Sequence, residues 1–195
     1  MKEGIFGGTF DPPHIGHLIA AESARESLGL DRIRFIPAAV PPHKRRPDIT
    51  SGEKRLEMVR LAIQGNPAFI ADERELRRKG TSYTIETIRE LREELPGIEF
   101  TLLIGMDNLQ EFRLWKEPEK IRTLAEVVAL SRPGAVALGV VENGRGFRVV
   151  TIPLIEVSSS AIRRLVREGR SIRYLVPQEV EEMIMREGLY VHSPI

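Results

Sequence analysis

Short runs rich in β-branched and aromatic residues alternate along this chain with longer stretches in which apolar residues recur every three or four positions. This alternation is typical of βα units arranged around a mostly parallel sheet, so it predicts an α/β fold. The run 100–104 is continuous and apolar, as expected of a central strand covered on both faces. The expected strands, about six in all, are the runs 2–7, 33–37, 68–71, 100–104, 127–130 and 149–152.

The stretches between these runs predict helices with recognisable start and stop signals. In the first of them, Leu18, Ala21, Ala24 and Leu28 fall on one stripe, and Gly29 is a typical helix stop. Further helices are expected to begin at Thr50 or Ser51, near Thr84, at Ser158 and before Val180. Together the elements predict a Rossmann-like, doubly wound, mostly parallel sheet with helices on both faces and a C-terminal helical segment.

Length and charge limit the classes of protein to consider. With 195 residues, the chain is long enough for one well-buried core, and we treat 1–195 as a single domain. Lysine and arginine number 29 against 28 aspartates and glutamates, so no overall field attracts nucleic acid or a membrane surface. Any anion site must be built locally. The sequence gives no account of oligomeric state, and a homo-oligomer is compatible with it.

The absence of cysteine excludes disulfides, thiol catalysis and zinc–thiolate sites. It also agrees with a reducing compartment, and the cytoplasm is the default expectation. No segment approaches the roughly 20 consecutive apolar residues that a membrane helix needs. We therefore expect a protein that neither spans a membrane nor is secreted.

The most informative segment follows the first predicted strand and reads GGTFDPPHIGH, residues 7–17. In an open α/β sheet, ligands bind beyond the carboxyl ends of strands, where the chain turns into the next helix. The two leading glycines permit close approach of a ligand to the backbone. If the turn is helical, His14 and His17 project from one face, and Gly16 between them leaves room for a base or phosphate. The free N–H groups and the dipole of a helix start make an anion the expected occupant.

Two other glycine-rich motifs do not match. The segment lacks the G-x-G-x-x-G order of dinucleotide-binding folds and the terminal Lys-Ser/Thr of a P-loop, so neither hydride transfer nor Walker-type hydrolysis is favoured. An isolated histidine would be interpreted as a surface or capping residue. The whole string of residues 7–17, however, closely resembles the H-x-G-H signature of the nucleotidyltransferase superfamily, which includes adenylyl- and cytidylyltransferases.

Within that superfamily, four later segments resemble those of bacterial nicotinate mononucleotide adenylyltransferases, in the same order and over nearly the whole chain. They are PPHK at 41–44, GTSYT at 80–84, GMD at 105–107 with Trp115 downstream, and VSSSAIR at 157–163. Many relatives carry Thr where Ser160 stands and Ile where Val157 stands. Both differences are mild and leave the resemblance intact.

The resemblance implies a role for each matching residue. The catalytic group would be His14, His17, Lys44 and Arg163. The ATP-binding group would be Gly7, Gly8, Thr9, Phe10, His14, His17, Gly105, Asp107, Ser158, Ser159, Ser160 and Arg163. Nicotinate mononucleotide would contact Thr9, Lys44, Tyr83, Thr84 and Trp115, with carboxylate donors among backbone N–H groups near Thr84 and Trp115.

Several of these residues also have a purely structural interpretation. A run of serines at 158–160 is commonly a helix N-cap. Asp107 could bind ribose hydroxyls or cap a helix beginning at Asn108, and a lone Trp115 usually packs in a core. Arg45 and Arg46 could simply belong to a solvated basic loop, and their roles stay open.

The implied reaction is attack by the phosphate of nicotinate mononucleotide on the α-phosphorus of ATP, which gives nicotinate adenine dinucleotide and pyrophosphate. A phosphate monoester has a second pKa near roughly 6, so the nucleophile is ionised at neutral pH and needs no general base. Cations must instead offset the repulsion between the reacting anions. The resemblance implies that Mg²⁺, held mainly by the ATP phosphates, acts beside the histidines, Lys44 and Arg163.

Rival functions differ in the acceptor or in the absence of catalysis. Nicotinamide mononucleotide, phosphopantetheine or another phosphorylated acceptor would use the same nucleotide chemistry. A tRNA synthetase is disfavoured because no K-M-S-K-S string is present. A regulator that binds nucleotide without turnover is the alternative from another class. The sequence does not predict the ratio between nicotinate and nicotinamide acceptors, movement of the loop Pro41 to Asp48 or the structure of Ala135 to Gly146.

Overall fold

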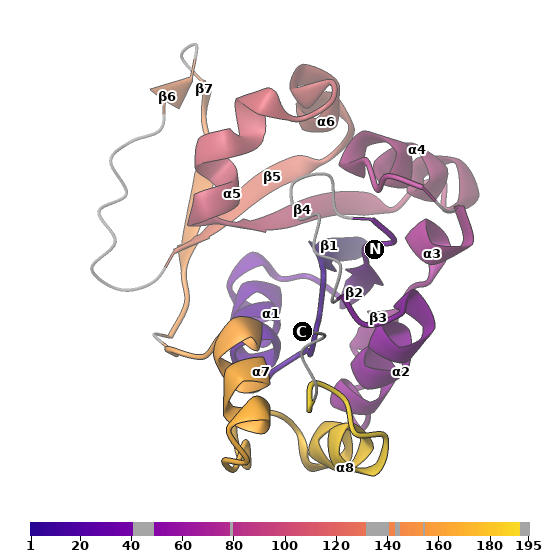
Figure 1. Ribbon diagram of the computed structural model, residues 1–195. Helices are drawn as coiled ribbons and strands as arrows, with labels where there is room; N and C mark the ends of the chain where they lie inside the picture. The colour runs from indigo at the N-terminus through magenta and orange to yellow at the C-terminus, as the bar shows by residue number, and fades with distance from the viewer. Residues whose placement is uncertain (41–48, 79, 132–140, 143–144, 154, 192–195) are drawn as a thin grey trace.

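The computed structural model describes residues 1–40, 49–78, 80–131, 141–142, 145–153 and 155–191. A six-stranded sheet forms its centre, with strand order β3-β2-β1-β4-β5-β8 (Figure 1). Every neighbouring pair in this sheet is parallel. The predicted α/β sheet and its six strands are confirmed: β1 (Lys2–Gly8), β2 (Arg32–Pro37), β3 (Phe69–Ala71), β4 (Glu99–Gly105), β5 (Glu126–Ser131) and β8 (Arg148–Thr151).

Strand order places a switch point between β1 and β4. From β1 the chain proceeds to β2 and β3 on one side, and it then crosses over to β4, β5 and β8 on the other. β4 is buried along Phe100–Ile104, which agrees with the central position predicted from its continuous apolar run. The crossover leaves a crevice at the carboxyl ends of β1 and β4, where ligands bind in folds of this kind.

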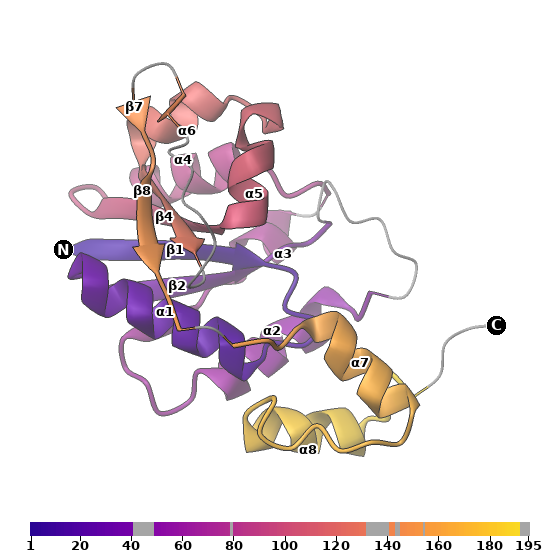
Figure 2. The ribbon, with the colours of Figure 1, turned by 90° about the vertical axis from the view of Figure 1, so that its left-hand side faces the viewer.

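Helices cover both faces of the sheet, as predicted (Figure 2). The expected helices are α1 (Ile15–Leu28), α2 (Gly52–Ala62), α4 (Thr84–Glu94), α7 (Ser159–Arg167) and α8 (Gln178–Arg186). Three short elements were not predicted: the helices α3 (Arg74–Arg78) and α6 (Pro118–Leu124), and the 3-10 helix η1 (Phe112–Leu114). The short helix α5 (Met106–Glu111) was considered only as an alternative that begins at Asn108. Within 135–146, the structure describes only the antiparallel pair β6 (Val141–Glu142) and β7 (Arg145–Gly146).

Alternating side chains of the strands pack into hydrophobic clusters on opposite faces of the sheet. Phe35 and Leu103 pack with Ala21 of α1 on one face, whereas Ile36 and Leu102 pack with α4, α5 and α6 on the other. A further cluster joins α7 and α8 to α2, and it forms the predicted C-terminal helical segment. No helix in the described part of the chain has both the length and the apolar character needed to cross a membrane.

Candidate active site

A cavity of about 1080 Å³ opens at the switch point of the sheet. Single ligand pockets typically enclose roughly 300–1,000 Å³, so this cavity is at the upper end of that range. Fifteen of the sixteen residues that the sequence assigned to substrates line it: Gly7, Gly8, Thr9, Phe10, His14, His17, Tyr83, Thr84, Gly105, Asp107, Trp115, Ser158, Ser159, Ser160 and Arg163. The other one, Lys44, lies outside the described residues together with Arg45, Arg46 and the rest of 41–48. The fold therefore brings segments far apart in the sequence to one place.

The two histidines lie in contact at the start of α1. His14 is the residue before the helix, and its ring stacks on that of His17 with centroids 3.6 Å apart and planes inclined by 23°. The backbone N–H of His14 donates to Nδ1 of His17 at 3.1 Å. When His17 is neutral, its proton therefore sits on Nε2, because Nδ1 acts as an acceptor. The backbone thus fixes His17 as a donor through Nε2.

Gly16 lines the cavity beside the histidine pair. A Cβ at Gly16 would lie 3.1 Å from Nδ1 of His14, closer than most side-chain contacts allow. Its lack of a side chain therefore permits the stacked arrangement of the two imidazoles.

The start of α7 is bound to the loop that precedes α1. Arg163 is 6% exposed, and its Nη1 donates to the carbonyl of Asp11 at 2.6 Å. Ser159 Oγ donates to the carbonyl of Pro12 at 2.8 Å. These bonds join residues 147 to 152 positions apart in the sequence. The two predicted phosphate-binding segments thus form one continuous wall of the cavity.

The serine hydroxyls have partners within the protein. Ser158 Oγ accepts from the backbone N–H of Ala161 at 3.2 Å, which confirms the capping interpretation for this residue. Ser160 Oγ accepts from Arg163 Nη2 at 3.3 Å. Helix α7 still presents the first-turn N–H groups that an anion would use. We keep a phosphate contact by this helix start as a hypothesis.

Asp107 is exposed on the wall of the cavity, and the helix that carries it begins earlier than expected. α5 starts at Met106 with Gly105 as its N-cap, so the alternative in which Asp107 caps a helix from Asn108 is wrong. A Cβ at Gly105 would lie 2.5 Å from Oδ1 of Asp107. Only glycine at position 105 leaves the carboxylate where it is, against the backbone at the end of β4.

Trp115 follows η1 and combines packing with an unused donor. Its ring lies 5.4 Å from that of Phe112, within the cluster beneath α4, so the core-packing interpretation is confirmed in part. Its backbone N–H donates to the carbonyl of Phe112 at 3.0 Å, and this donor is not available to a ligand. Its buried Nε1–H has no hydrogen-bond partner among the residues that the structure describes. A buried donor in this state is costly, so a ligand acceptor would stabilise it.

Tyr83 and Thr84 stand at the start of α4, on the other side of the cavity. Tyr83 gives no side-chain cap to this helix. Lys116 Nζ lies 4.5 Å from the centre of the Tyr83 ring and pairs with Glu86 at 2.6 Å. The hydrogen bond that Lys116 donates to Glu86 raises the pKa of Lys116. The lysine lines the cavity together with Tyr83, and its ammonium packs against the tyrosine ring.

Arg55, which the sequence analysis did not single out, organises the floor of the site. It lies on α2 and is 1% exposed. Its guanidinium donates to the carbonyls of Thr9 at 2.8 Å, Ala38 at 2.7 Å and Thr50 at 2.9 Å. Burial lowers the pKa of Arg55, but an ordinary value far above neutrality keeps it cationic. This one side chain therefore ties three segments together beneath the glycine-rich loop.

Comparison with known proteins places the chain among nucleotidyltransferases. Residues 5–165 match the profile of the family described as Cytidylyltransferase-like. A protein of Exiguobacterium sibiricum named probable nicotinate-nucleotide adenylyltransferase is 48% identical, with 97% of this chain and 99% of its own length covered. One of the same name from Geobacter metallireducens is 45% identical, with 99% of this chain and 100% of its own length covered.

Solved structures agree with the fold. A putative nicotinate-nucleotide adenylyltransferase from Vibrio parahaemolyticus superposes with a TM-score of 0.70 at 24% identity, over 98% of this chain and 96% of that one. Nicotinic acid mononucleotide adenylyltransferase from Plasmodium falciparum, complexed with NaAD, gives a TM-score of 0.79 at 16% identity, over 97% of both chains. These likenesses extend over nearly the whole chain, so the α/β architecture is shared from end to end.

Proposed function

The chain belongs to the cytidylyltransferase-like family, and from this premise we propose that it is a nicotinate-nucleotide adenylyltransferase of NAD biosynthesis. It transfers AMP from ATP to the phosphate of nicotinate mononucleotide and releases pyrophosphate. Relatives that are 48% and 45% identical over nearly their whole lengths carry that name. The observation that carries the proposal is the single cavity that holds both the stacked histidines and the Tyr83–Trp115 side.

In this proposal the ATP phosphates lie along the wall formed by the starts of α1 and α7. His17 Nε2 donates to a phosphate oxygen, a role supported by the hydrogen bond that makes its Nδ1 an acceptor. His14, the serine-rich helix start and Arg163 line the same wall. Asp107 accepts from ribose hydroxyls, since its carboxylate is exposed to the cavity and held against Gly105.

The acceptor occupies the side of the cavity between α4 and Trp115. The pyridine ring of nicotinate mononucleotide packs against the indole, and its carboxylate accepts from N–H groups at the start of α4. Trp115 Nε1–H, buried and without a partner in the described part of the chain, is a further donor on this side. Thr9, which lines the same cavity, contacts both substrates in this proposal. The resemblance implies that Lys44, which lies outside the described residues, binds the substrate phosphate.

The chemistry needs charge neutralisation and alignment more than proton transfer. The acceptor phosphate is already ionised at neutral pH, because its second pKa is near roughly 6. Two unit charges about 4 Å apart repel by roughly 4 kcal/mol at an effective dielectric constant near 20. Histidine and arginine donors on one wall offset this repulsion as the phosphate approaches the α-phosphorus, and holding both substrates in one cavity supplies the alignment.

A divalent cation completes the proposal, with Mg²⁺ as the expected ion. Among the described residues, no group of three or more histidine, aspartate or glutamate side chains is placed to hold a metal ion. In this proposal the phosphates of ATP are its main ligands, as the resemblance implies, and the bound ion supplies positive charge to the polyphosphate. We also propose the cytoplasm as the compartment, because the chain contains no cysteine.

Measurement of pyrophosphate release tests the function. The purified protein is incubated with ATP, Mg²⁺ and one of three acceptors: nicotinate mononucleotide, nicotinamide mononucleotide or phosphopantetheine. We expect the highest kcat/KM with nicotinate mononucleotide. A clear preference for phosphopantetheine would refute the acceptor assignment. ATP binding without pyrophosphate release for any acceptor would favour a nucleotide-binding regulator.

A further inference from the structure

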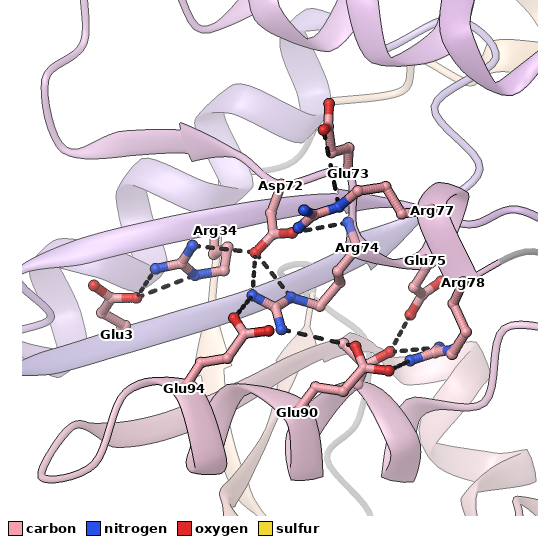
Figure 3. A network of polar contacts seen from close by, with 11 residues as sticks. Glu3, Arg34, Asp72, Glu73, Arg74, Glu75, Arg77, Arg78, Glu90 and Glu94 are labelled. Atoms are coloured by element: carbon pink, nitrogen blue, oxygen red, sulfur yellow. Dashed lines mark hydrogen bonds and ion pairs between the residues drawn. The ribbon is translucent and has the colours of Figure 1, made fainter.

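Glu75 is a buried carboxylate on the wall of the cavity that the proposed reaction does not use. It lies on the short helix α3, is 8% exposed and faces α4 (Figure 3). It lines the cavity together with Ser82, Tyr83, Thr84 and Thr87. Burying a carboxylate is costly unless hydrogen bonds compensate, so its partners show what it holds in place.

Two hydroxyl groups interact with this carboxylate. Thr87 Oγ1, on the first turn of α4, donates to Oε1 of Glu75 at 2.6 Å. The Ser82 hydroxyl, in the turn before that helix, lies near the same carboxylate and lowers its pKa. Tyr83 and Thr84 lie between these two residues in the sequence. A single carboxylate thus holds both sides of the segment that forms the proposed acceptor pocket.

The Ser82 side of this segment is held from a second direction. Ser82 Oγ accepts from the backbone N–H of Ala39 at 2.9 Å, and its own N–H donates to the carbonyl of Val40 at 3.1 Å. Because Ser82 also influences Glu75, its side chain lies between the end of β2 and α3. Any shift of Glu75 would therefore move the backbone on which Tyr83 and Thr84 sit.

Helix α3 is itself fixed to the sheet by an ion-pair network (Figure 3). Asp72 pairs with Arg74 at 2.9 Å and with Arg34 of β2 at 3.1 Å, and Arg34 pairs with the buried Glu3 of β1 at 2.7 Å. Arg78, at the other end of α3, donates to Thr87 Oγ1 at 3.0 Å. The position of Glu75 is thus set by the sheet, independently of any ligand.

We propose that Glu75 is a positioning residue that determines affinity for the acceptor, by holding Ser82 and Thr87 so that the start of α4 faces the acceptor carboxylate. This inference rests on the proposed function. Glu75 acts through the two hydroxyls and is not itself in the reaction. A different role would follow from its charge alone, since a carboxylate near the acceptor would repel it. The two roles predict opposite effects on acceptor affinity when the charge is removed.

The test compares the steady-state kinetics of Glu75→Gln with those of the wild type, varying nicotinate mononucleotide and ATP separately. The glutamine keeps the volume but offers one acceptor oxygen in place of two. We expect the KM for nicotinate mononucleotide to rise at least fivefold, with kcat and the KM for ATP within twofold. Glu73→Gln is the matched control, because that side chain is exposed and pairs with Arg60 away from the cavity. All kinetic constants of this control should stay within twofold.

A second pair of variants separates positioning from misfolding. Thr87→Val removes the hydroxyl at nearly constant shape, and Thr87→Ser restores it. We expect the acceptor KM to rise for valine and to return to within twofold of the wild type for serine. If Glu75→Gln fails to fold, this pair of variants tests whether the contact between Glu75 and Thr87 determines affinity for the acceptor.

An acceptor KM that is unchanged or lower in Glu75→Gln would overturn the inference, as would a parallel change in the KM for ATP. If Glu75→Gln does not fold, a normal acceptor KM in Thr87→Val would likewise overturn the inference. Wild-type protein that releases no pyrophosphate would overturn the proposed function and, with it, this inference. Active wild-type protein with normal variants would overturn the inference alone.

Discussion

At the scale of single residues, His17 is the side chain with the most specific chemistry. Its ring stacks on His14, lies edge-on to Phe10 at 5.1 Å and accepts a backbone hydrogen bond at Nδ1. These contacts leave Nε2–H as a donor of fixed direction. A donor held in this way stabilises developing charge without reorganising during the reaction.

We therefore predict that His17→Ala lowers kcat by at least about 100-fold, the loss typical of removing one preorganised donor to an oxyanion. The pyrophosphate assay gives kcat, and a circular dichroism spectrum that matches the wild type would show that the fold is retained. Near-normal turnover in the folded variant would reject the role. Glu57→Ala, an exposed position on α2, is the control and should keep normal kcat.

Glu75 gives a pH dependence of stability whose sign is fixed by its burial. Desolvation raises its pKa despite the bonds from Thr87 and Ser82; Arg78 lowers this pKa and Glu90 raises it through their charges. The folded state therefore favours the protonated carboxyl. Its stabilising contribution is complete below the ordinary glutamate pKa and is lost as pH rises through the raised value.

Glu75→Gln removes this titration. We expect the difference in unfolding free energy, variant minus wild type, to increase as pH rises above the ordinary glutamate pKa and to level off above the raised pKa of Glu75. Urea denaturation at several pH values measures it, and groups common to both proteins cancel in the difference. A difference that stays constant or decreases with pH would contradict the prediction.

Sequence motifs identified many of the residues that line the cavity. They did not identify the buried charged residues that hold those motifs in position. Cavity-lining residues such as His14 and Asp107 stand in motifs with restricted spacing. Arg55 and Glu75 lie in charged stretches whose ordinary interpretation is an exposed helix face. Their burial depends on carbonyls and hydroxyls contributed by distant segments, which no local pattern records.

At the scale of elements, the end of α1 shows how local sequence sets a boundary. Gly29 adopts φ 62°, in the left-handed region, and its N–H bonds with the carbonyl of Glu26 while that of Leu30 bonds with Arg25. No atom lies within 4 Å of a Cβ added at Gly29. Any cost of a side chain there comes from the backbone conformation alone.

We predict that Gly29→Ala destabilises the protein by about 1 kcal/mol, the penalty of placing a non-glycine residue in this conformation. Ser27→Ala, on the exposed face of the same turn, should change stability by less than about 0.5 kcal/mol. Thermal or urea unfolding of both variants provides the comparison. Equal stabilities would show that the glycine is not needed to end the helix.

Elements with strong apolar periodicity were predictable, and short charged ones were not. The strands and the long helices α1, α2, α4, α7 and α8 follow from their patterns. Helix α3 has only five residues, four of them charged. It therefore lacks the apolar periodicity from which a helix can be predicted. Its ion pairs with the sheet and α4 stabilise it, and such pairs have no signature in a single sequence. For the same reason, the side of the cavity formed by α3 and α4 was predicted less fully than the side formed by the starts of α1 and α7.

At the scale of the whole molecule, the strand order explains why one cavity can hold two substrates. β1 and β4 are neighbours although β2 and β3 intervene in the sequence, so the loops after them open onto one crevice. The alternation of elements predicted this sheet, but not which strands would be neighbours. We propose that the chain acts as one domain, because the C-terminal cluster is built on α2 of the sheet layer.

The C-terminal part of the chain is also tied to the glycine-rich loop. Tyr190 OH donates to Oδ1 of the buried Asp11 at 2.8 Å, across 179 positions of sequence. Burial and the neighbouring Asp11 raise the pKa of Tyr190, so the hydroxyl stays protonated as a donor. This bond joins the two ends of the described chain at the base of the site.

We predict that Tyr190→Phe lowers the unfolding free energy by about 2 kcal/mol, the usual worth of a hydrogen bond to a charged group. Tyr174→Phe is the control, since Tyr174 is 84% exposed and should change stability by less than about 0.5 kcal/mol. Urea denaturation measures both. A loss below about 0.5 kcal/mol for Tyr190→Phe would show that the bond contributes little.

The bond between Tyr190 and Asp11 has a consequence for biosynthesis. During translation, Asp11 leaves the ribosome long before Tyr190 does, and the bond between them can form only after Tyr190 has emerged. Until then, the loop that carries Asp11 lacks this contact.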